Sequence, residues 1–400
     1  MTLIVDIHAL HTVPPSLINR DDTGAPKTAV FGGVPRQRVS SQSWKRAIRQ
    51  YMEQNIDSSL VGFRSKKLPG KIAELVQEQN PDWPVEQVIQ GVENLFKAVG
   101  PKGIKLEKPK KSASTEEDCS RGESYPETGY LLFLSPHQIT RAAEIISQNH
   151  GGKIAKKDAK SILDTEHSVD VAMFGRMLAD APSYNVDAAV QVAHAISVHG
   201  TEPEFDYFTA VDDIVEDAEE SGAALINTVQ MMSSTLYRYA TINVDGLAHN
   251  LGSKDAASEA VGYFLQAFTE SLPTGKINTF ANQTLPELIY VAIRDTRPVS
   301  LVNAFEEAVT SDEREGKTRR EVAAEKMAQE EKHVEETYGF VPKASFVVAL
   351  GTLGSSFAEL STSTTMTTLS AQVQEVLRAE QRYVILFTVT PVKGSYAVLG

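Results

Sequence analysis

The chain has 400 residues, of which 42% are hydrophobic, and its formal net charge is −13 with a pI of about 5.3. This length and apolar content are sufficient for a large core, in one elaborated domain or in two to three subdomains. The single cysteine, Cys119, excludes an intramolecular disulfide, and no apolar stretch approaches the roughly 18 residues of a membrane span. The first residues lack the basic start of a signal peptide. We therefore expect a globular protein of the cytoplasm without a membrane partner.

The first 50 residues predict a strand, a loop and a helix. The strand covers Thr2–His11 and ends at Pro14-Pro15, and the loop is punctuated by glycine and proline. The helix begins at Ser40 or Ser41. Its polar and basic rows are Ser41, Lys45 and Arg49 beside Gln42 and Arg46, and its apolar face is Trp44, Ile48 and Tyr51. Backbone N–H groups, hydroxyls and cations therefore converge at the helix start, which indicates phosphate binding. An ordinary amphipathic helix with solvated cations is the alternative.

Charge is distributed unevenly along the chain. Residues 1–50 contain seven Lys or Arg against three Asp, a net charge of +4, which leaves −17 for the remainder. Residues 102–111 add a lysine-rich segment, whereas residues 201–220 contain nine acids and no Lys or Arg. A free-standing nucleic-acid-binding domain usually has a basic balance. The pattern instead predicts one basic groove on a protein whose outer surface repels other nucleic acid.

Residues 52–168 read as a helical insertion. Amphipathic helices are predicted over Lys71–Gln79, Val85–Val99 and Gln138–Ser147, with a short strand over Tyr130–Leu134. The apolar run Val169–Met177 follows.

The remainder alternates strands and helices. The long segments Val186–Val198 and Ala223–Val244 resemble the two sides of an extended β-hairpin arm. Helices are then predicted over Ser258–Ser271, Ser300–Val309 and Arg319–Thr337, and strands over Leu288–Ile293, Ser345–Leu350 and Tyr383–Val389. Together with the opening strand and helix, this order predicts an α+β protein built on a heavily inserted β-α-β-β-α-β sheet.

Most catalytic signatures do not occur in the sequence. A Walker A motif, G-x-G-x-x-G and G-x-S-x-G are all missing, so nucleotide hydrolysis, dinucleotide binding and acyl transfer lack their patterns. His8 and His11 have a spacing that could suggest a metal, but no cysteine cluster or H-E-x-x-H accompanies them, and a pair of histidines at a strand end is usually structural. We expect no cofactor and no metal site.

Three blocks of sequence are distinctive. The first runs through Ile7–Leu10, Asn19–Asp22, Pro26–Ala29, Gly32–Val34 and Arg38–Arg46; the second through Val169–Met177, Tyr184–Ala195, Phe208–Asp213 and Tyr237–Ala240; the third is Pro273–Ala281. In order and spacing they resemble CasC, the backbone subunit family of the type I-E CRISPR surveillance complex Cascade. The resemblance covers roughly 40% of the chain.

The resemblance implies a fold shaped like a right hand. An RNA-recognition-like, ferredoxin-like palm would comprise residues 1–54 and 241–400, helical fingers residues 55–180, and a β-hairpin thumb residues 181–240. Such subunits bind CRISPR RNA, assemble head to tail with copies of themselves, contact other Cascade subunits, and meet target DNA through the guide. The chain departs from ordinary RNA-recognition modules because it lacks their aromatic consensus.

The resemblance also implies RNA-contacting residues. Those expected to hold backbone phosphates are Asn19, Arg20, Lys27, Arg38, Ser40, Gln42, Lys45, Arg46 and Arg49, and those expected to wedge between bases are Met173, Tyr207, Phe208 and Thr209. Without the resemblance, Met173 and Phe174 could equally be core residues. Related type III subunits cut RNA with an aspartate in a comparable loop, so a metal-dependent ribonuclease using Asp21 and Asp22 is one alternative. We favour the interpretation that the two aspartates pair with Arg20 or cap the turn before Gly24. A scaffold that binds only protein is another. We expect a binding protein that is not an enzyme.

Overall fold

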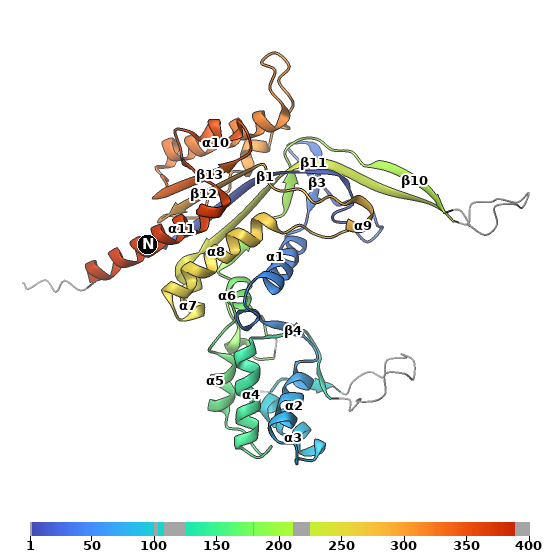
Figure 1. Cartoon of the computed structure of the whole chain (residues 1–400), viewed down its shortest axis with the longest axis vertical. Helices are drawn as coiled ribbons and strands as arrows, with labels where there is room; N and C mark the ends of the chain where they lie inside the picture. The colour runs from blue at the N-terminus through green and yellow to red at the C-terminus, as the bar shows by residue number, and fades with distance from the viewer. Residues whose placement is uncertain (1, 100–102, 108–124, 179, 211–224, 389–400) are drawn as a thin grey trace, which may run out of the picture. The chain divides into compact units, whose positions relative to one another are not determined.

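The computed structural model describes the chain except residues 1, 100–102, 108–124, 179, 211–224 and 389–400 (Figure 1). The acidic run 212–220, Cys119, and residues 102 and 108–111 of the lysine-rich segment lie outside the described residues. In chain order the elements are β1 (Ile4–Ser16), β2 (Thr28–Phe31), β3 (Val34–Val39), α1 (Ser41–Asn55), η1 (Ser58–Leu60), β4 (Phe63–Ser65), α2 (Leu68–Gln79), α3 (Val85–Ala98), β5 (Leu106–Glu107), β6 (Glu127–Thr128), β7 (Leu132–Leu134), α4 (Pro136–Gln148), α5 (Lys156–Leu163), α6 (Val169–Phe174), η3 (Pro182–Tyr184), β8 (Val190–Val192), β9 (Ala195–Ser197), β10 (Glu204–Ala210), β11 (Leu225–Asn243), α7 (Val244–Leu251), α8 (Lys254–Glu270), α9 (Ile277–Phe280), β12 (Leu288–Arg294), η4 (Val302–Phe305), α10 (Arg319–Tyr338), β13 (Ala344–Ala349), η5 (Leu353–Phe357), β14 (Thr362–Ser363) and α11 (Met366–Thr388).

The chain divides into two compact units. The first comprises 1–48, 192–241 and 258–400, and the second comprises 49–191 and 242–257. The boundary at 48/49 falls within α1, so Arg46 belongs to the first unit and Arg49 to the second. The predicted division into palm, fingers and thumb has three parts, and it stays a prediction.

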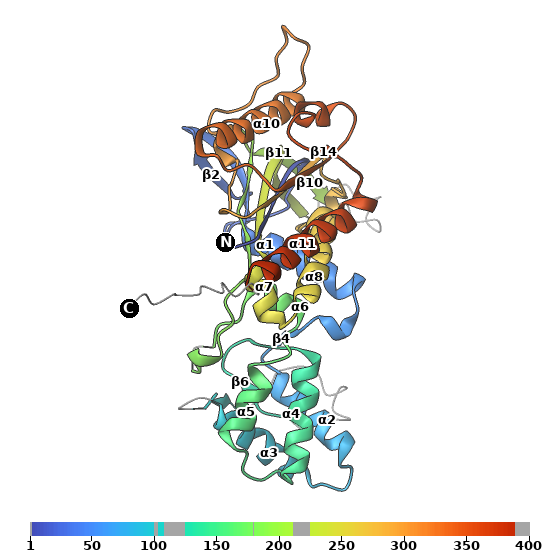
Figure 2. The ribbon, with the colours of Figure 1, turned by 90° about the vertical axis from the view of Figure 1, so that its left-hand side faces the viewer.

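The first unit is built on a large sheet with the strand order β14-β13-β12-β1-β11-β9-β3-β2. The central strand β1 pairs antiparallel with β12, from Ile4 opposite Arg294 to Leu10 opposite Leu288. Helix α10 lies on one face of the sheet, and α8 and α11 lie on the other (Figure 2). Because both faces of β1 are covered, its residues from Ile4 to His11 are all buried.

A buried ionic network joins the sheet to α10. The Arg294 guanidinium donates to Asp6 Oδ2 at 3.1 Å and to Glu331 Oε1 at 2.6 Å, and all three side chains have no exposed surface. Tyr290 donates its hydroxyl to Glu331 Oε1 at 3.1 Å, and Tyr239 donates to Asp6 Oδ1 at 2.9 Å. These bonds fix β1, β11 and β12 against α10 through polar groups rather than through apolar packing alone.

The opposite face contains a buried arginine. The Arg238 guanidinium lies 3.7 Å from the Trp44 ring centroid and 4.3 Å from that of Phe268, and it donates to His11 Nδ1 at 3.0 Å and to the Phe268 carbonyl. Burial, with Arg238 nearby, lowers the pKa of His11 to about 3. His8 is hydrogen-bonded at 2.9 Å to the Tyr237 hydroxyl. Both histidines are therefore held inside the core by hydrogen bonds.

The second unit has a helical core of its own. Apolar side chains of α2, α3, α4 and α5 form one cluster, which includes Ile72, Val76, Val92, Leu95, Ile139, Ile146 and Ile162. Helix α4 begins with a capping box, in which Ser135 and Gln138 each bond the other's backbone N–H. The predicted helices over Lys71–Gln79, Val85–Val99 and Gln138–Ser147 are confirmed as α2, α3 and α4.

Two predicted elements are wrong, and the first strand is longer than predicted, because β1 continues through Pro14-Pro15 to Ser16. Residues Ser300–Val309 form only the short 3-10 helix η4, because tertiary hydrogen bonds take the backbone groups of a longer helix: Arg36 binds the carbonyls of Phe305 and Glu306, and the Val309 N–H donates to the Val198 carbonyl. The predicted strand over Tyr383–Val389 is helical to Thr388, the end of α11, and Val389 lies outside the described residues. A helix already formed upstream extends into this run and overrides its β propensity.

The predicted arm is confirmed only in part. The first half of β11 pairs with β10, from Ala210 opposite Leu225 to Glu204 opposite Met231, whereas its second half pairs with β9 and β8. Within the first unit, the β10–β11 ribbon extends beyond the rest of the sheet (Figure 1). The mixed α+β class is confirmed. Among the described residues, no helix is long and apolar enough to cross a membrane.

Candidate nucleic-acid interface

The loop before α1 is fastened to the start of that helix. The Ser40 N–H donates to Asn19 Oδ1 at 2.9 Å, and the Lys27 N–H donates to the Asn19 carbonyl at 3.0 Å. Ser40 is buried, and its hydroxyl accepts the Ser43 N–H at 3.4 Å as an N-cap. Asn19 and Ser40 thus position the loop, while exposed Gln42 stands on the first turn.

Asp21 organises the tip of this loop. Its Oδ1 accepts hydrogen bonds from the Thr23 hydroxyl at 2.7 Å, the Thr23 N–H at 2.9 Å and the Ala25 N–H at 3.0 Å. These bonds lower the pKa of Asp21, and the bond from the Thr23 hydroxyl has the largest effect. Gly24 completes the turn with φ +90°. The interpretation of Asp21 as a turn cap is confirmed.

Several predicted cations lie at the surface of the first unit. Arg20 and Arg46 are exposed, and neither has an ion-pair partner within the described part of the chain; Lys45 and Lys27 are half-buried. Partial burial, together with the charges of Arg38 and Lys27, lowers the pKa of His194. The structure therefore brings Lys27, Arg38 and His194 together.

Arg38 is partly occupied by contacts within the fold. Its Nε donates to the Thr28 carbonyl at 3.3 Å, and one terminal nitrogen lies 3.2 Å from His194 Nδ1. These contacts hold the guanidinium along the β2–β3 hairpin and leave it half-buried.

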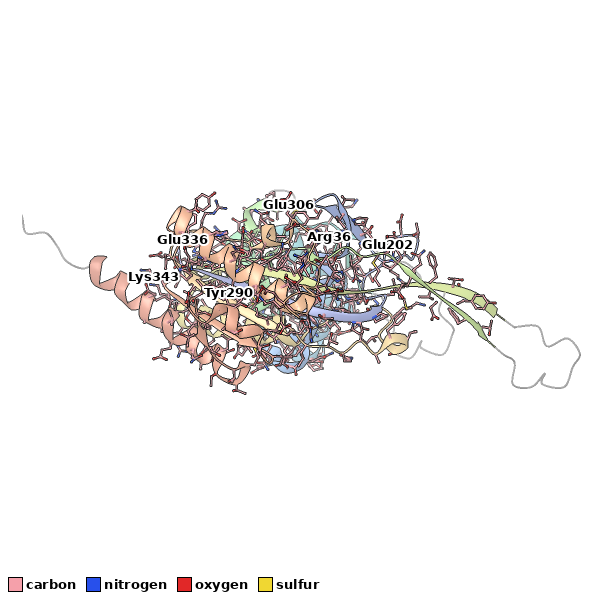
Figure 3. All side chains as sticks on the ribbon, turned by 90° about the horizontal axis from the view of Figure 1, so that it is seen from above. Arg36, Glu202, Tyr290, Glu306, Glu336 and Lys343 are labelled. Carbon is pink, nitrogen blue, oxygen red and sulfur yellow. The ribbon has the colours of Figure 1, made fainter. Side chains whose placement is uncertain are left out.

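Arg36 does not belong to the basic surface. Its side chain is buried and donates to the carbonyls of Ser197 at 3.1 Å, Phe305 at 3.1 Å and Glu306 at 3.0 Å. Figure 3 shows Arg36 close to Glu306. The net charge of +4 over residues 1–50 therefore overstates the basic charge that the surface presents.

Arg49 is bound inside the second unit. Its Nε donates to Asp170 Oδ2 at 3.3 Å, a terminal nitrogen lies 3.2 Å from Glu53 Oε1, and the guanidinium stacks 4.7 Å from the Phe133 centroid. The Asp170 side chain is fully buried and also accepts the Gly62 N–H at 2.9 Å. Arg49 therefore neutralises a buried carboxylate, and its predicted phosphate contact stays a prediction.

Met173 lies in the core of the second unit. It is fully buried on α6, and a side chain in that position cannot wedge between bases without a rearrangement. Gly175, with φ +76°, ends α6. The buried Arg176 side chain donates hydrogen bonds to the carbonyls of Phe133, Leu163 and Tyr184. The next side chain, Met177, is 78% exposed. The structure thus presents Met177 where the sequence analysis named Met173.

The predicted thumb residues are exposed on the β10–β11 ribbon of the first unit. Tyr207 is 62% and Phe208 38% exposed, and Thr209 is exposed as well. Phe205, which the sequence analysis did not single out, is 68% exposed and lies two residues before Tyr207, on the same face of the strand. Isolated exposed apolar side chains are common, but Phe205 and Tyr207 stand side by side on one face of this short strand and form an apolar surface there, while Phe208 is exposed on the opposite face.

A family model described as CT1975-like protein matches residues 5–375. The chain belongs to the CT1975-like family. Its structure is similar to a chain of a "CRISPR RNA-guided surveillance complex, pre-nicking", with 35% identity and a TM-score of 0.78, covering 94% of this chain and 99% of that one. A chain of a "CRISPR RNA-guided surveillance complex" is 30% identical, with a TM-score of 0.70 and the same coverage. No curated protein matched. The predicted resemblance to a Cascade backbone subunit is confirmed.

Two groups of this CT1975-like protein were missed by the sequence analysis. In the sequence alone, Met177 and Phe205 look like core residues. Only the alternation of buried and exposed side chains, after Gly175 and along β10, shows that these two point outward. The grouping of His194 with Lys27 and Arg38 could not be predicted, because both partners lie far from it in sequence.

The tight turn between β2 and β3 leads to a prediction about the stability of the protein. Gly32 and Gly33 form a two-residue turn with φ +58° and +74°, and a Cβ on Gly32 would lie 1.7 Å from the Glu306 carbonyl oxygen, whereas one on Gly33 meets nothing within 4 Å. We expect Gly33→Ala to cost about 1 kcal/mol and Gly32→Ala about 2–3 kcal/mol in urea unfolding. Equal costs would show that the Glu306 contact moves away freely.

Proposed function

We propose that this protein binds CRISPR RNA through its phosphate backbone, independently of base sequence, as the repeating backbone subunit of a Cascade-type complex of type I-E. The observation that carries the proposal is the surface at the start of α1, where Arg20 and Arg46 are exposed beside Lys27 in a chain with a net charge of −13. Cations left exposed on an otherwise acidic protein favour a polyanion at this surface.

Phosphate binding suits a guide of any sequence. Contacts to phosphates fix the register of a strand but carry no sequence information, so one subunit can hold every spacer. The target would be read by base pairing with the guide, which the protein displays to DNA. In this proposal Arg20, Lys27, Arg38, Lys45 and Arg46 contact phosphates.

The strand order supports an RNA-recognition-like palm. Along the chain β1, α1, β9, β11, α8 and β12 follow one another as β-α-β-β-α-β, and in the sheet these strands stand in the order β12-β1-β11-β9. The β10–β11 ribbon would be the thumb, and the helical second unit would supply the fingers.

Exposed apolar side chains would act as wedges. Met177 of the second unit takes the role first given to Met173, and Phe205, Tyr207 and Phe208 with Thr209 line the ribbon of the first. Apolar wedges unstack any base at a cost of a few kcal/mol per step, which repeated backbone contacts offset. Regularly spaced wedges require copies of the chain arranged head to tail along the RNA, together with other Cascade subunits.

We propose no catalytic role for the chain. A ribonuclease would need aspartates free to hold a metal ion. One carboxylate oxygen of Asp21 instead accepts three hydrogen bonds within the loop that it caps. Among the described residues no group of three or more His, Cys, Asp or Glu is placed to hold a metal ion. Asp22 is exposed and gives no second ligand by itself.

Copurification tests the proposal. We expect the protein, produced together with a CRISPR RNA of any spacer, to purify with RNA of uniform length and with excess absorbance at 260 nm, and this association should weaken steeply as salt rises. A scaffold that binds only protein would purify without RNA. A ribonuclease would yield shortened RNA that disappears from the preparation in Asp21→Asn, and either result would contradict the proposal.

A further inference from the structure

The segment from Ser271 to Pro286, which contains α9 and is called the α9 segment below, has an unusual composition. It carries seven hydroxyl or amide side chains, one cation and no carboxylate, in a chain that has 52 acids. Thr274, Asn278 and Thr279 of this segment are exposed. Neutral hydrogen-bonding groups are thus concentrated at one part of the surface of the first unit.

The α9 segment lies directly against the start of the proposed phosphate-binding loop. A Cβ on Gly275 would stand 2.4 Å from the Ile18 carbonyl oxygen and 2.6 Å from that of Leu17, so only glycine allows this approach. Ile18 is followed by Asn19 and Arg20, and Figure 1 shows α9 in the first unit near the strands that flank this loop. A strand held by the loop therefore passes within reach of α9.

The backbone of the α9 segment is held in an unfavourable conformation at both ends of the helix. Lys276 has φ +47° and Ala281 has φ +46°, although neither is glycine. Left-handed conformations of non-glycine residues are uncommon and gather at ligand sites.

Asn282 has an unmet hydrogen-bonding capacity. Its side chain is 1% exposed, and neither its amide nitrogen nor its amide oxygen has a partner within the described part of the structure. A buried amide without partners costs about 1–3 kcal/mol, and such a group calls for an explanation by a ligand or a water. The amide presents a donor and an acceptor side by side, which match a hydroxyl group that both accepts and donates.

We propose that the α9 segment binds ribose 2′-hydroxyl groups and thereby makes the subunit prefer RNA to DNA. Asn278 and Thr279 bind them at the surface, and Asn282 does so when the segment shifts toward the strand. The cations of the loop and of α1 cannot make this distinction, because RNA and DNA share their phosphates, whereas the 2′-hydroxyl belongs to RNA alone. This inference rests on the proposed RNA-binding function and adds the source of its sugar preference.

The test compares two single strands of one base sequence, an RNA and a DNA that contains deoxyuridine, binding to the full chain. The variants are Asn278→Ala with Thr279→Ala, and Asn282→Leu; Arg46→Ala is the matched control. We expect each α9 variant to weaken RNA binding by about three- to tenfold while DNA binding stays unchanged, because a lost hydrogen bond to the hydroxyl affects RNA only. Arg46→Ala should weaken both by the same factor.

The outcomes separate this inference from the function on which it rests. If the unmodified protein binds neither strand, the proposed function fails. If it binds RNA, loses affinity with Arg46→Ala and keeps its RNA-to-DNA ratio in the α9 variants, the function stands and the α9 inference is overturned. Asn282→Leu should melt no lower than the unmodified protein, since it removes unpaired buried polar atoms. If it fails to fold, the exposed pair Asn278 and Thr279 decides alone.

Discussion

Replacement of Arg294 by methionine is expected to lower the free energy of unfolding by about 3–5 kcal/mol, because it leaves two buried carboxylates without their cation. Asp6 and Glu331 both bind this guanidinium and have no exposed surface. Burial already raises the pKa of Asp6, and the loss of Arg294 removes one of the groups that oppose this effect. The measurement is urea unfolding at neutral pH, followed by near-ultraviolet circular dichroism.

Arg297→Met is the matched control for Arg294→Met. Arg297 is exposed, three residues further on, and donates to the Pro298 carbonyl at 3.2 Å. Its replacement should change the unfolding free energy by no more than about 0.5 kcal/mol. Similar losses in both variants would mean that methionine, rather than the broken ionic network, is the cause.

Arg46→Ala and Arg49→Ala are expected to have different effects, the first on RNA binding and the second on stability, although the two residues stand about one helical turn apart. Arg46 is exposed without an ion-pair partner in the described structure, so its loss should weaken RNA binding for every spacer and lower the salt slope by about 1. Arg49 neutralises buried Asp170, so its loss should cost about 3–5 kcal/mol of stability. Filter binding over a salt series and thermal unfolding measure the two effects.

Asp170→Asn with Arg49→Ala distinguishes the two roles of Arg49. If Arg49 acts only through the buried carboxylate, removing that charge should restore most of the stability and leave RNA binding intact. Should Arg49→Ala fold normally and bind RNA less tightly, Arg49 would be a phosphate ligand, as the sequence predicts, and the ion pair would be incidental.

The sequence determined the features of this protein whose causes are local. Capping residues and periodic apolar positions, a few residues apart in sequence, predict the N-cap at Ser40 and the helix that follows it. The same kinds of pattern predict the helices α2, α3, α4 and α10. The distinctive blocks were also sufficient to place the chain in its family, because a motif is read directly from neighbouring residues.

Tertiary structure alone decided what the individual charged and apolar side chains do. Arg36, Arg46 and Arg49 are equivalent cations in a linear pattern, and they separate only because Arg36 meets the carbonyls of Phe305 and Glu306, Arg49 meets Asp170, and Arg46 meets no acid in the described structure. Met173 and Met177 separate in the same way, one into a core and one out of it. The partners responsible lie more than 100 residues away along the chain for both bound arginines, and a distance of that kind is set by the fold and not by the local pattern.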